Sequence, residues 1–434
     1  MSRILLRGGR VVDPVAGTDT TADVLVDGET IAEVGTELDD TGATVVDVSG
    51  QVVTAGFVDL HTHLREPGFE DAEDVATGSA AGAAGGYTGL CSMANTDPVC
   101  DSAAVAEMVW RRGREVGLVD VFPVGAITKG LGGKELAELG ELHGSKARVD
   151  CFSDDGKPVA DSLIMRRALQ YATRFDAVIM NHSEDPDLTA DAQMNEGRMS
   201  SLLGLAGWPH EAEEVMIARD LILAAGVGAR LHVPHVTTKQ AAELIRQAKA
   251  RGVRVTAEVT PHHLSLDDTV VATYDSRYKV NPPVRTTEDV EALRAALADG
   301  TIDAVATDHA PHAPETKDVE WDVAPCGMLG LETAFAVVHT DLVQNEAIDL
   351  VTAIQRFTTG PAGVRDVDGH GGAVAAGAPA NLTVLDLDTR WTVAGSALRS
   401  RARNTPFEGR ELAGRPVHTL LRGRFTLRDL EVQL

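Results

Sequence analysis

Residues 58–68, VDLHTHLREPG, begin as an apolar strand and end in charged and turn-forming residues. His61 and His63 stand two positions apart, so in an extended chain their side chains point to the same face. Two imidazoles on one face can bind one cation together, which makes the pair a candidate metal site. A single pair of this kind also arises by coincidence, so its meaning depends on the residues in the rest of the chain.

Short apolar runs that alternate with helical stretches surround and follow this pair. Along the chain they read GYTGLCSMAN, LVDVFPVGAIT, ARVDCFSDD, DAVIMNH, ARLHVPHV, RVTAEVTPHH and IDAVATDH. Repeated strand-then-helix order predicts the α/β class and a (β/α)8 TIM-type barrel, which we place at residues 56–374. In such a barrel the functional groups lie at the C-terminal ends of the strands, where the polar residues of these runs fall.

The two ends of the chain have a different pattern. Residues 1–55 hold short β-patterned runs separated by turns, with Asp27-Gly28 as a strong hairpin signal, and predict a small antiparallel sheet. The same pattern returns in residues 375–434. We therefore expect both ends to combine into one discontinuous β-sandwich domain.

Composition and charge narrow the function. The formal net charge of −26 excludes nucleic acid and anionic membranes as partners, because an acidic field repels phosphate. No signal segment and no apolar run of bilayer length is evident, which predicts a soluble, cytoplasmic protein. The cysteines are scattered without a C-x-x-C pair, so neither a disulfide framework nor a thiolate zinc site is expected; they are Cys91, Cys100, Cys151 and Cys326.

Further ligand-type residues stand at the ends of later apolar runs: Asp154 and Asp155, His182, His235 and Asp308. Alone, a histidine such as His182 is more often a core residue than a ligand, and Asp155 could instead cap the next helix. Together, five such strand ends are hard to explain by packing. Four histidines and a carboxylate suit zinc best, with manganese or cobalt as alternatives, and predict a two-metal centre bridged by a carboxylate.

Three other histidines lie nearby. His232 stands three residues before His235 and should face the opposite side of the extended run, which indicates a structural role. His262 and His263 also lie at a strand end and could support the ligands from outside.

The motifs VDLHTHLREPG, DDG and TDHAPH together resemble the dihydroorotase family, and the likeness extends to GAPANLTVLD at residues 377–386. The resemblance implies the reversible cyclisation of N-carbamoyl-L-aspartate to dihydroorotate in pyrimidine biosynthesis. It also implies two zinc ions, one held by His61 and His63 and one by His182 and His235. Asp155 would bridge them, with Asp154 in reserve, and Asp308 would be the metal-bound acid/base.

The same resemblance implies a set of substrate contacts: His63, Leu64, Arg65, Asn95, Asn281, His312, and the backbone around Cys326 and Gly327. A guanidinium fork suits the carboxylate of dihydroorotate, although Arg65 could instead be solvated or form a salt bridge with Glu66. Many relatives bridge their metals with a carboxylated lysine, but the only nearby candidate, Lys146, lies too early in the chain.

The sequence leaves two rival functions open. Allantoinases and hydantoinases share the metal chemistry but generally lack the arginine after the histidine pair. A catalytically silent scaffold that supports aspartate transcarbamoylase need not keep its ligands, whereas this chain has all six. A homo-oligomer and an association with aspartate transcarbamoylase stay possible, and the loop-rich segment 310–330 is expected to be a lid or binding loop.

Overall fold

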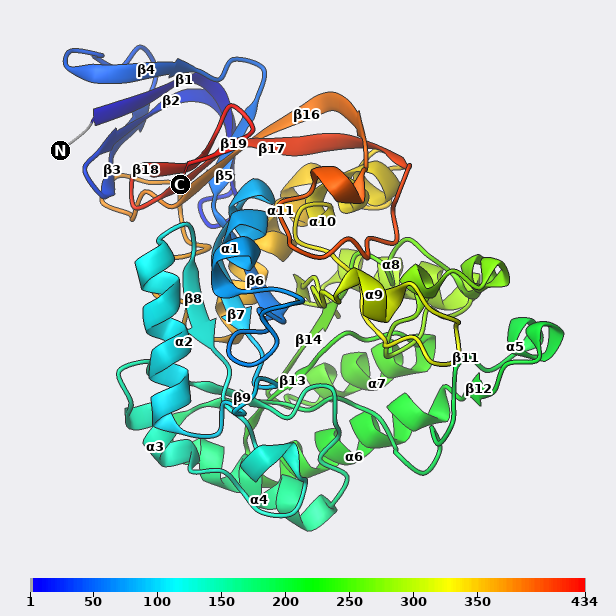
Figure 1. The fold of residues 1–434 in the computed structure, drawn as a ribbon. Coiled ribbons are helices and arrows are strands. Elements are labelled where there is room, and N and C mark those ends of the chain that lie inside the picture. Colours follow the sequence, from blue (N-terminus) through cyan, green and yellow to red (C-terminus); the bar gives the residue numbers. More distant parts are fainter. Residues whose placement is uncertain (1–2, 434) are drawn as a thin grey trace.

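The computed structural model describes residues 3–433, so the outermost residues of the expected sandwich, 1–2 and 434, lie outside it. Figure 1 shows a β-sheet unit that contains both ends of the chain and, beside it, a barrel enclosed by helices. Among the described residues, no helix combines the length and the apolar character needed to cross a membrane. All four cysteines are free.

Eight parallel strands close the barrel in their order along the chain. Two groups of neighbouring strands, β6 to β8 and β9 to β15, are joined at both seams by parallel bridges, Gly125 to Phe152 and Thr62 to His309. The expected (β/α)8 barrel is confirmed, and each apolar run supplies one strand. The strands are β6 (Phe57–Thr62), β7 (Tyr87–Ser92), β8 (Asp120–Pro123), β9 (Cys151–Ser153), β10 (Val178–Met180), β13 (Arg230–Val233), β14 (Val255–Val259) and β15 (Ala304–Val305).

Helices cover the outside of the barrel and begin or end where the sequence supplies caps. The Asp161 carboxylate accepts hydrogen bonds from the first turn of α4, and Gly228 ends α6 in the left-handed conformation that glycine adopts without strain. The α-helices are α1 (Val75–Ala84), α2 (Ala103–Val116), α3 (Leu139–Gly144), α4 (Ser162–Ala172), α5 (Arg198–Leu203), α6 (Glu211–Val227), α7 (Lys239–Ala250), α8 (Thr287–Asp299), α9 (Pro314–Lys317), α10 (Ala334–Val338), α11 (Leu350–Phe357) and α12 (Thr359–Val364). A small excursion beside α5 pairs β11 (Met194–Asn195) with β12 (Gly207–Trp208).

Strands from both ends of the chain share one sheet, because β16 pairs antiparallel with β5. This confirms the β-sandwich unit built from both termini. Its strand order is β19-β18-β17-β16-β5-β1-β2-β3, with β4 also paired to β1. The strands are β1 (Arg3–Asp13), β2 (Thr18–Asp27), β3 (Thr30–Gly35), β4 (Ala43–Asp47), β5 (Val52–Ala55), β16 (Leu382–Thr392), β17 (Glu411–Leu421), β18 (Arg424–Arg428) and β19 (Glu431–Val432).

The expectation of a purely antiparallel N-terminal sheet is wrong in one respect. β1 pairs antiparallel with β2, but it pairs parallel with β4 through its first half and with β5 through its second half. The register of β1 shifts between Leu6 and Gly9, which lets one long strand serve two partners. Such a change of partner depends on tertiary packing and leaves no turn signal in the sequence.

Phe57 packs where the chain passes from the sheet into the barrel. Its ring lies 5.8 Å from that of Tyr87, 5.6 Å from Phe335 and 5.1 Å from Phe357, centroid to centroid. These residues belong to a continuous apolar cluster beneath the helices, whereas the sheet unit has an apolar cluster of its own. The rigid packing leaves the opposite, C-terminal ends of the barrel strands free to hold polar groups.

Candidate functional site

All six expected ligands lie at the C-terminal ends of barrel strands, and all are buried. His61 ends β6, and the other five lie in the turns just after β6, β9, β10, β13 and β15. His235 and Asp308 have positive φ angles of 33° and 46°, a conformation that is costly for residues other than glycine. The fold therefore holds strained backbone at two of these positions, as is common at functional sites.

The Asp155 carboxylate lies at the centre of the cluster. Its Oδ2 atom is 3.3 Å from His61 Nε2 and 3.4 Å from His63 Nε2. Its Oδ1 atom is 3.5 Å from His182 Nδ1 and 3.4 Å from His235 Nε2. Each oxygen thus faces one histidine pair, which is the arrangement a carboxylate needs to bridge two cations.

These separations fit metal coordination better than direct hydrogen bonding. Tetrahedral zinc with ligand distances near 2.0–2.1 Å places ligand atoms about 3.3 Å apart. Asp308 Oδ1 lies 3.4 Å from His61 Nε2 and 3.0 Å from His63 Nε2, on the same side as Asp155 Oδ2. His61 Nε2 is buried without a hydrogen-bond partner, and His61, His63 and Asp308 form one group able to hold an ion. The residues present therefore fit a divalent cation.

Asp154 does not compete for this place. Its carboxylate accepts hydrogen bonds from the backbone N–H groups of Ile127 and Thr128 at 2.8 and 2.9 Å, and from the Thr128 hydroxyl. The helix that Asp155 might have capped, α4, is capped by Asp161 instead. Among the two adjacent aspartates, only Asp155 is directed at the histidines.

The carboxylates and the imidazoles of the cluster shift one another's pKa values toward their charged forms. Burial opposes charge on His61, but the carboxylates of Asp155 and Asp308 outweigh it and raise the pKa of His61 well above its ordinary value. Burial also opposes charge on Asp308, but His61 and His63 hold the pKa of Asp308 below its ordinary value. Asp308 is therefore ionised at neutral pH, which is the form that binds cations and accepts protons.

A cavity of about 220 Å³ opens onto the cluster. Of the eight residues expected to contact substrate, seven line it: His63, Arg65, Asn95, Asn281, His312, Cys326 and Gly327. Leu64 is the exception, and its expected contact with substrate stays a prediction that only its backbone can fulfil. Because neighbouring residues of an extended chain alternate, the Leu64 side chain is directed into the apolar core, where it is fully buried.

Arg65 brings a half-buried cation to this cavity. Its Nε atom donates to the Pro311 carbonyl at 3.1 Å, and within residues 3–433 its guanidinium forms no ion pair. The alternative partner, Glu66, pairs with Arg112 instead, at 3.3 Å. Burial lowers the pKa of Arg65, yet arginine stays protonated at any physiological pH. A half-buried guanidinium without an ion pair, at the wall of a cavity, favours an anionic ligand group.

Two asparagines supply the neutral contacts. Asn95 Oδ1 lies 2.9 Å from His63 Nδ1, and so it orients that imidazole. Asn281 Nδ2 donates to Glu184 Oε2 at 2.8 Å, while its Oδ1 is buried without a partner. An unsatisfied buried carbonyl oxygen in a cavity favours a ligand that brings an N–H group.

His312 is a neutral side chain in this setting. Burial, assisted by the charge of Arg65, lowers the pKa of His312 to about 3. Its Nε2 lies 2.7 Å from the Cys326 carbonyl, and because a carbonyl only accepts, Nε2 carries the proton. This bond ties the beginning of the 310–330 segment to its far end.

Comparisons with known proteins agree with this geometry. The family models "Dihydro-orotase-like" and "Amidohydrolase family" match residues 50–241 and 151–426. A dihydroorotase of Streptomyces coelicolor is 54% identical over 429 residues, which cover 99% of each chain. A dihydroorotase of Mycobacterium tuberculosis is 51% identical over 432 residues, again 99% of each chain. The chain belongs to the dihydroorotase family.

Solved structures similar to this dihydroorotase-family chain carry the same architecture. An L-hydantoinase (dihydropyrimidinase) from Arthrobacter aurescens superposes with a TM-score of 0.89 at 26% identity, covering 100% of this chain and 98% of that chain. A dihydropyrimidinase from Brevibacillus agri gives 0.86 at 24% identity, covering 99% and 96%, and shows the fold alone. Amidohydrolases are metal-dependent, which accords with the histidine and aspartate groups described above.

Glu258 in β14 supports the dihydroorotase centre and was not found from the sequence. Its carboxylate accepts from His61 Nδ1 at 2.8 Å and from His232 Nε2 at 3.0 Å. Burial opposes its charge, but these two histidines lower the pKa of Glu258 to about 2. The bond fixes the proton of His61 on Nδ1 and leaves Nε2 free for a cation. A buried glutamate within the apolar run RVTAEVTPHH was the available signal.

The other nearby histidines have supporting contacts. His232, which the sequence indicated as structural, also bonds Thr256 Oγ1 at 2.8 Å. His263 bonds the Pro282 carbonyl at 3.0 Å, whereas His262 Nε2 is buried without a partner. Glu184, a second residue missed from the sequence, lies 2.9 Å from His182 Nε2 and also accepts from Asn281.

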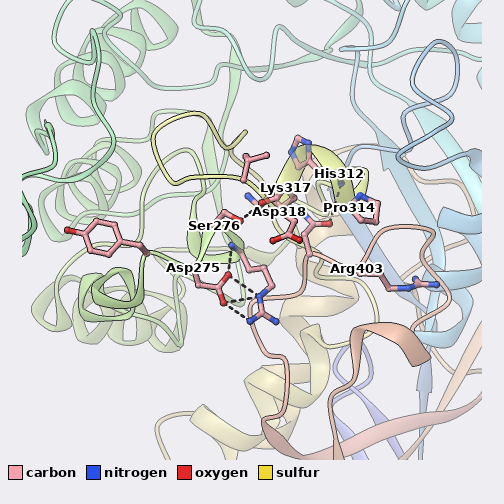
Figure 2. A pocket seen from close by; sticks show the side chains of 11 residues that line it. Asp275, Ser276, His312, Pro314, Lys317, Asp318 and Arg403 are labelled. Atoms are coloured by element: carbon pink, nitrogen blue, oxygen red, sulfur yellow. Dashed lines mark hydrogen bonds and ion pairs between the residues drawn. The ribbon is translucent and has the colours of Figure 1, made fainter.

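The 310–330 segment of this dihydroorotase-family chain is held by lysines. Lys317 Nζ, at the end of α9, donates to the carbonyls of Lys279 at 3.1 Å and Pro325 at 2.7 Å. Lys279 Nζ donates to the carbonyls of Trp321 at 2.6 Å and Asp322 at 3.2 Å. The Ser276 hydroxyl donates a hydrogen bond to the Lys317 carbonyl. Figure 2 shows both residues at a second pocket, on the outer side of the segment.

Replacing Glu258 with glutamine should weaken metal binding about 10- to 100-fold. The Glu258 carboxylate accepts one hydrogen bond from His61 and one from His232, whereas a glutamine amide has only one oxygen to accept them. Metal content after dialysis against graded chelator measures this. The matched control is Asp120→Asn, whose carboxylate bonds His370 at the other end of the barrel and should leave metal content unchanged. Wild-type metal retention in Glu258→Gln would show that the bond does not orient His61.

Lys317 predicts a pH dependence of stability. Burial lowers the pKa of Lys317 to about 7, below the value near 10.4 of an unfolded lysine. Between these values the unfolded chain binds more protons, so the free energy of unfolding should rise as pH increases from about 7 to 10. Urea unfolding should show a smaller rise in Lys317→Met. Equal pH profiles for both proteins would contradict the depressed pKa.

Proposed function

We propose that this centre catalyses the reversible cyclisation of N-carbamoyl-L-aspartate to (S)-dihydroorotate and water, in pyrimidine biosynthesis. The observation that carries the proposal is one cavity that joins the Asp155-centred histidine cluster to the half-buried guanidinium of Arg65, which forms no ion pair within residues 3–433. The cluster suits hydrolysis of a cyclic amide, and the guanidinium suits a carboxylate beside the ring.

The proposed cofactors are two Zn²⁺ ions. His61, His63 and Asp308 would hold one ion, His182 and His235 the other, and Asp155 would bridge them. When bound, such ions supply Lewis-acid activation of water and of the amide carbonyl. Manganese or cobalt would also suit these ligands.

Asp308 is the proposed acid/base. It is ionised and buried, and its Oδ1 atom lies on the cavity side of His61 and His63. During ring opening it accepts the proton of the attacking water, whose oxygen forms a bond to the amide carbon. As the ring C–N bond breaks, Asp308 delivers that proton to the departing nitrogen. In the cyclising direction the same carboxylate removes the proton from the ureido nitrogen.

Neutral and charged contacts would orient the substrate. Arg65 binds the carboxylate through its free N–H groups, and the unpartnered Oδ1 of Asn281 accepts from a ring N–H. Asn95 holds His63 through Oδ1 and keeps its amide N–H groups for the ligand. His312 and the backbone of Cys326 and Gly327 form the side of the cavity under the 310–330 segment.

The acid/base role is tested with the purified chain in high salt, before and after chelation and zinc add-back. Dihydroorotate hydrolysis should disappear on chelation and return with zinc. Asp308→Asn should keep its metal, because four histidines and Asp155 remain, but lose about 10²- to 10⁴-fold in kcat. Absence of dihydroorotate hydrolysis by the wild-type chain, with its metal content confirmed, would overturn the proposed reaction.

Arg65 should distinguish dihydroorotate, which carries a carboxylate, from cyclic amides that carry none. Arg65→Met should lower kcat/KM for dihydroorotate by about 10²-fold or more, since one buried ionic contact is lost. Its kcat/KM for dihydrouracil, which has no carboxylate, should change little. A wild-type preference for dihydrouracil, hydantoin or allantoin would instead favour the hydantoinase or allantoinase alternative.

Three finer expectations stay predictions. A cytoplasmic location accords with the chemistry of a biosynthetic enzyme, and fractionation of cells tests it. Self-association and association with aspartate transcarbamoylase are tested by sedimentation of the chain alone and with that partner.

The silent-scaffold alternative is disfavoured by the convergence of all six ligands, since a scaffold needs none of them.

A further inference from the structure

Asn404 joins three backbone groups of the segment that closes the substrate cavity. Its Nδ2 donates to the carbonyls of Ala310 at 3.0 Å and Gly327 at 3.1 Å. Its Oδ1 accepts from the N–H of His312 at 3.2 Å. These contacts connect the beginning of the 310–330 segment, just after β15, to its far end.

The contacts use both N–H donors and the oxygen of the Asn404 amide. Two carbonyls can only accept and one N–H can only donate, so the partners fix which end of the amide is oxygen. Asn404 is 3% exposed, so its polar atoms depend on these partners more than on bulk solvent. No other neutral side chain of this size offers two donors and one acceptor in this geometry.

Asn404 comes from the C-terminal half of the sheet unit. The chain leaves β16, crosses toward the barrel through residues 393–410 and returns as β17; Figure 1 shows this orange-to-red connection next to α10 and α9. Glu73 holds the crossing by accepting from Ser400 and Arg401, and Leu329 N donates to the Asn404 carbonyl at 3.2 Å. The side chain is thus presented from a fixed support.

Within the segment that Asn404 holds, His312 lines two cavities. On one side lies the 220 Å³ cavity over the metal cluster, and on the other lies a pocket of about 410 Å³ lined by His312, Lys317 and Asn404, among others. Figure 2 shows His312 and Pro314 at this outer pocket. At a position open to two cavities, the hydrogen bonds of Asn404 fix where the backbone lies.

We propose that Asn404 is a positioning residue for substrate binding, which holds His312 and the backbone of Cys326 and Gly327 against the ligand. The proposal rests on the proposed dihydroorotase function for its kinetic readout. Asn404 touches neither the metal ligands nor the reacting atoms, and so it acts through the segment alone. A sequence element of the sheet unit would then determine affinity at the barrel.

Asn404→Ala and Asn404→Asp test this proposal. Asn404→Asp keeps the acceptor for His312 N–H but faces two carbonyls with a carboxylate. Both variants should raise KM for dihydroorotate at least about tenfold, the factor that corresponds to one lost buried hydrogen bond, with a much smaller change in kcat. Metal content should equal that of the wild type, because no ligand contacts Asn404.

The matched control is Asn381→Ala. Asn381 is also buried and also joins two backbone segments, donating to Gly369 O at 2.8 Å and accepting from Arg422 N at 2.7 Å, but it lies in the sheet unit away from the cavity. It should lower Tm comparably and leave KM unchanged. An equal rise of KM in both variants, unchanged KM in Asn404→Ala, or loss of its metal would overturn the proposal.

A second readout is independent of the reaction. The backbone N–H of His312 should exchange with deuterium faster in Asn404→Ala than in wild type or Asn381→Ala, because its acceptor is gone. If the wild-type chain does not turn over dihydroorotate, the proposed function fails. The deuterium exchange rate of the His312 N–H then still tests whether Asn404 positions the segment. Unchanged exchange at His312 would reject the positioning role even in an active enzyme.

Discussion

The burial of the Asp155 carboxylate is the constraint on which the site depends. A carboxylate removed from water is costly unless it is paired and hydrogen-bonded. Here each oxygen faces one histidine pair at 3.3 to 3.5 Å, so the four imidazoles must arrive from different strands at one point. Closure of a parallel barrel brings those strand ends together, because all eight strands end on the same face.

Support for this centre continues outward through two further carboxylates, one buried (Glu258) and one half-buried (Glu184). Glu258 binds the far side of His61, and Glu184 joins His182 to Asn281. Each of these bonds fixes the orientation of an imidazole and so keeps its other nitrogen directed at the centre. The network thereby couples metal ligands to cavity residues: Glu184 contacts one of each, and Asn95 connects His63 to the cavity.

The sequence was sufficient for what depends on local pattern. Repeated strand-then-helix order and strand-end polar residues predicted the eight-stranded barrel, and spacing placed His61 and His63 on one face. It was insufficient where partners are distant or backbone is irregular. Leu64 was expected as a substrate contact, and its side chain lies in the apolar core rather than at the cavity. Glu258 reads as an ordinary strand residue until β14 lies next to β13, and the parallel partners of β1 have no local signature.

Asn404 illustrates the deeper limit, because it stands 92 residues from His312 and lies within a stretch that otherwise belongs to the sheet unit. No motif, charge run or periodicity marks it. The crossing between β16 and β17 nevertheless belongs to a sheet that the two chain ends share, because β16 pairs with β5. Pairing of β16 with β5 fixes that sheet to the strand that leads directly into β6 and its histidines. The sheet unit therefore contacts the barrel in two ways. Its strand β5 leads into β6, and its residue Asn404 holds the 310–330 segment beside the cavity.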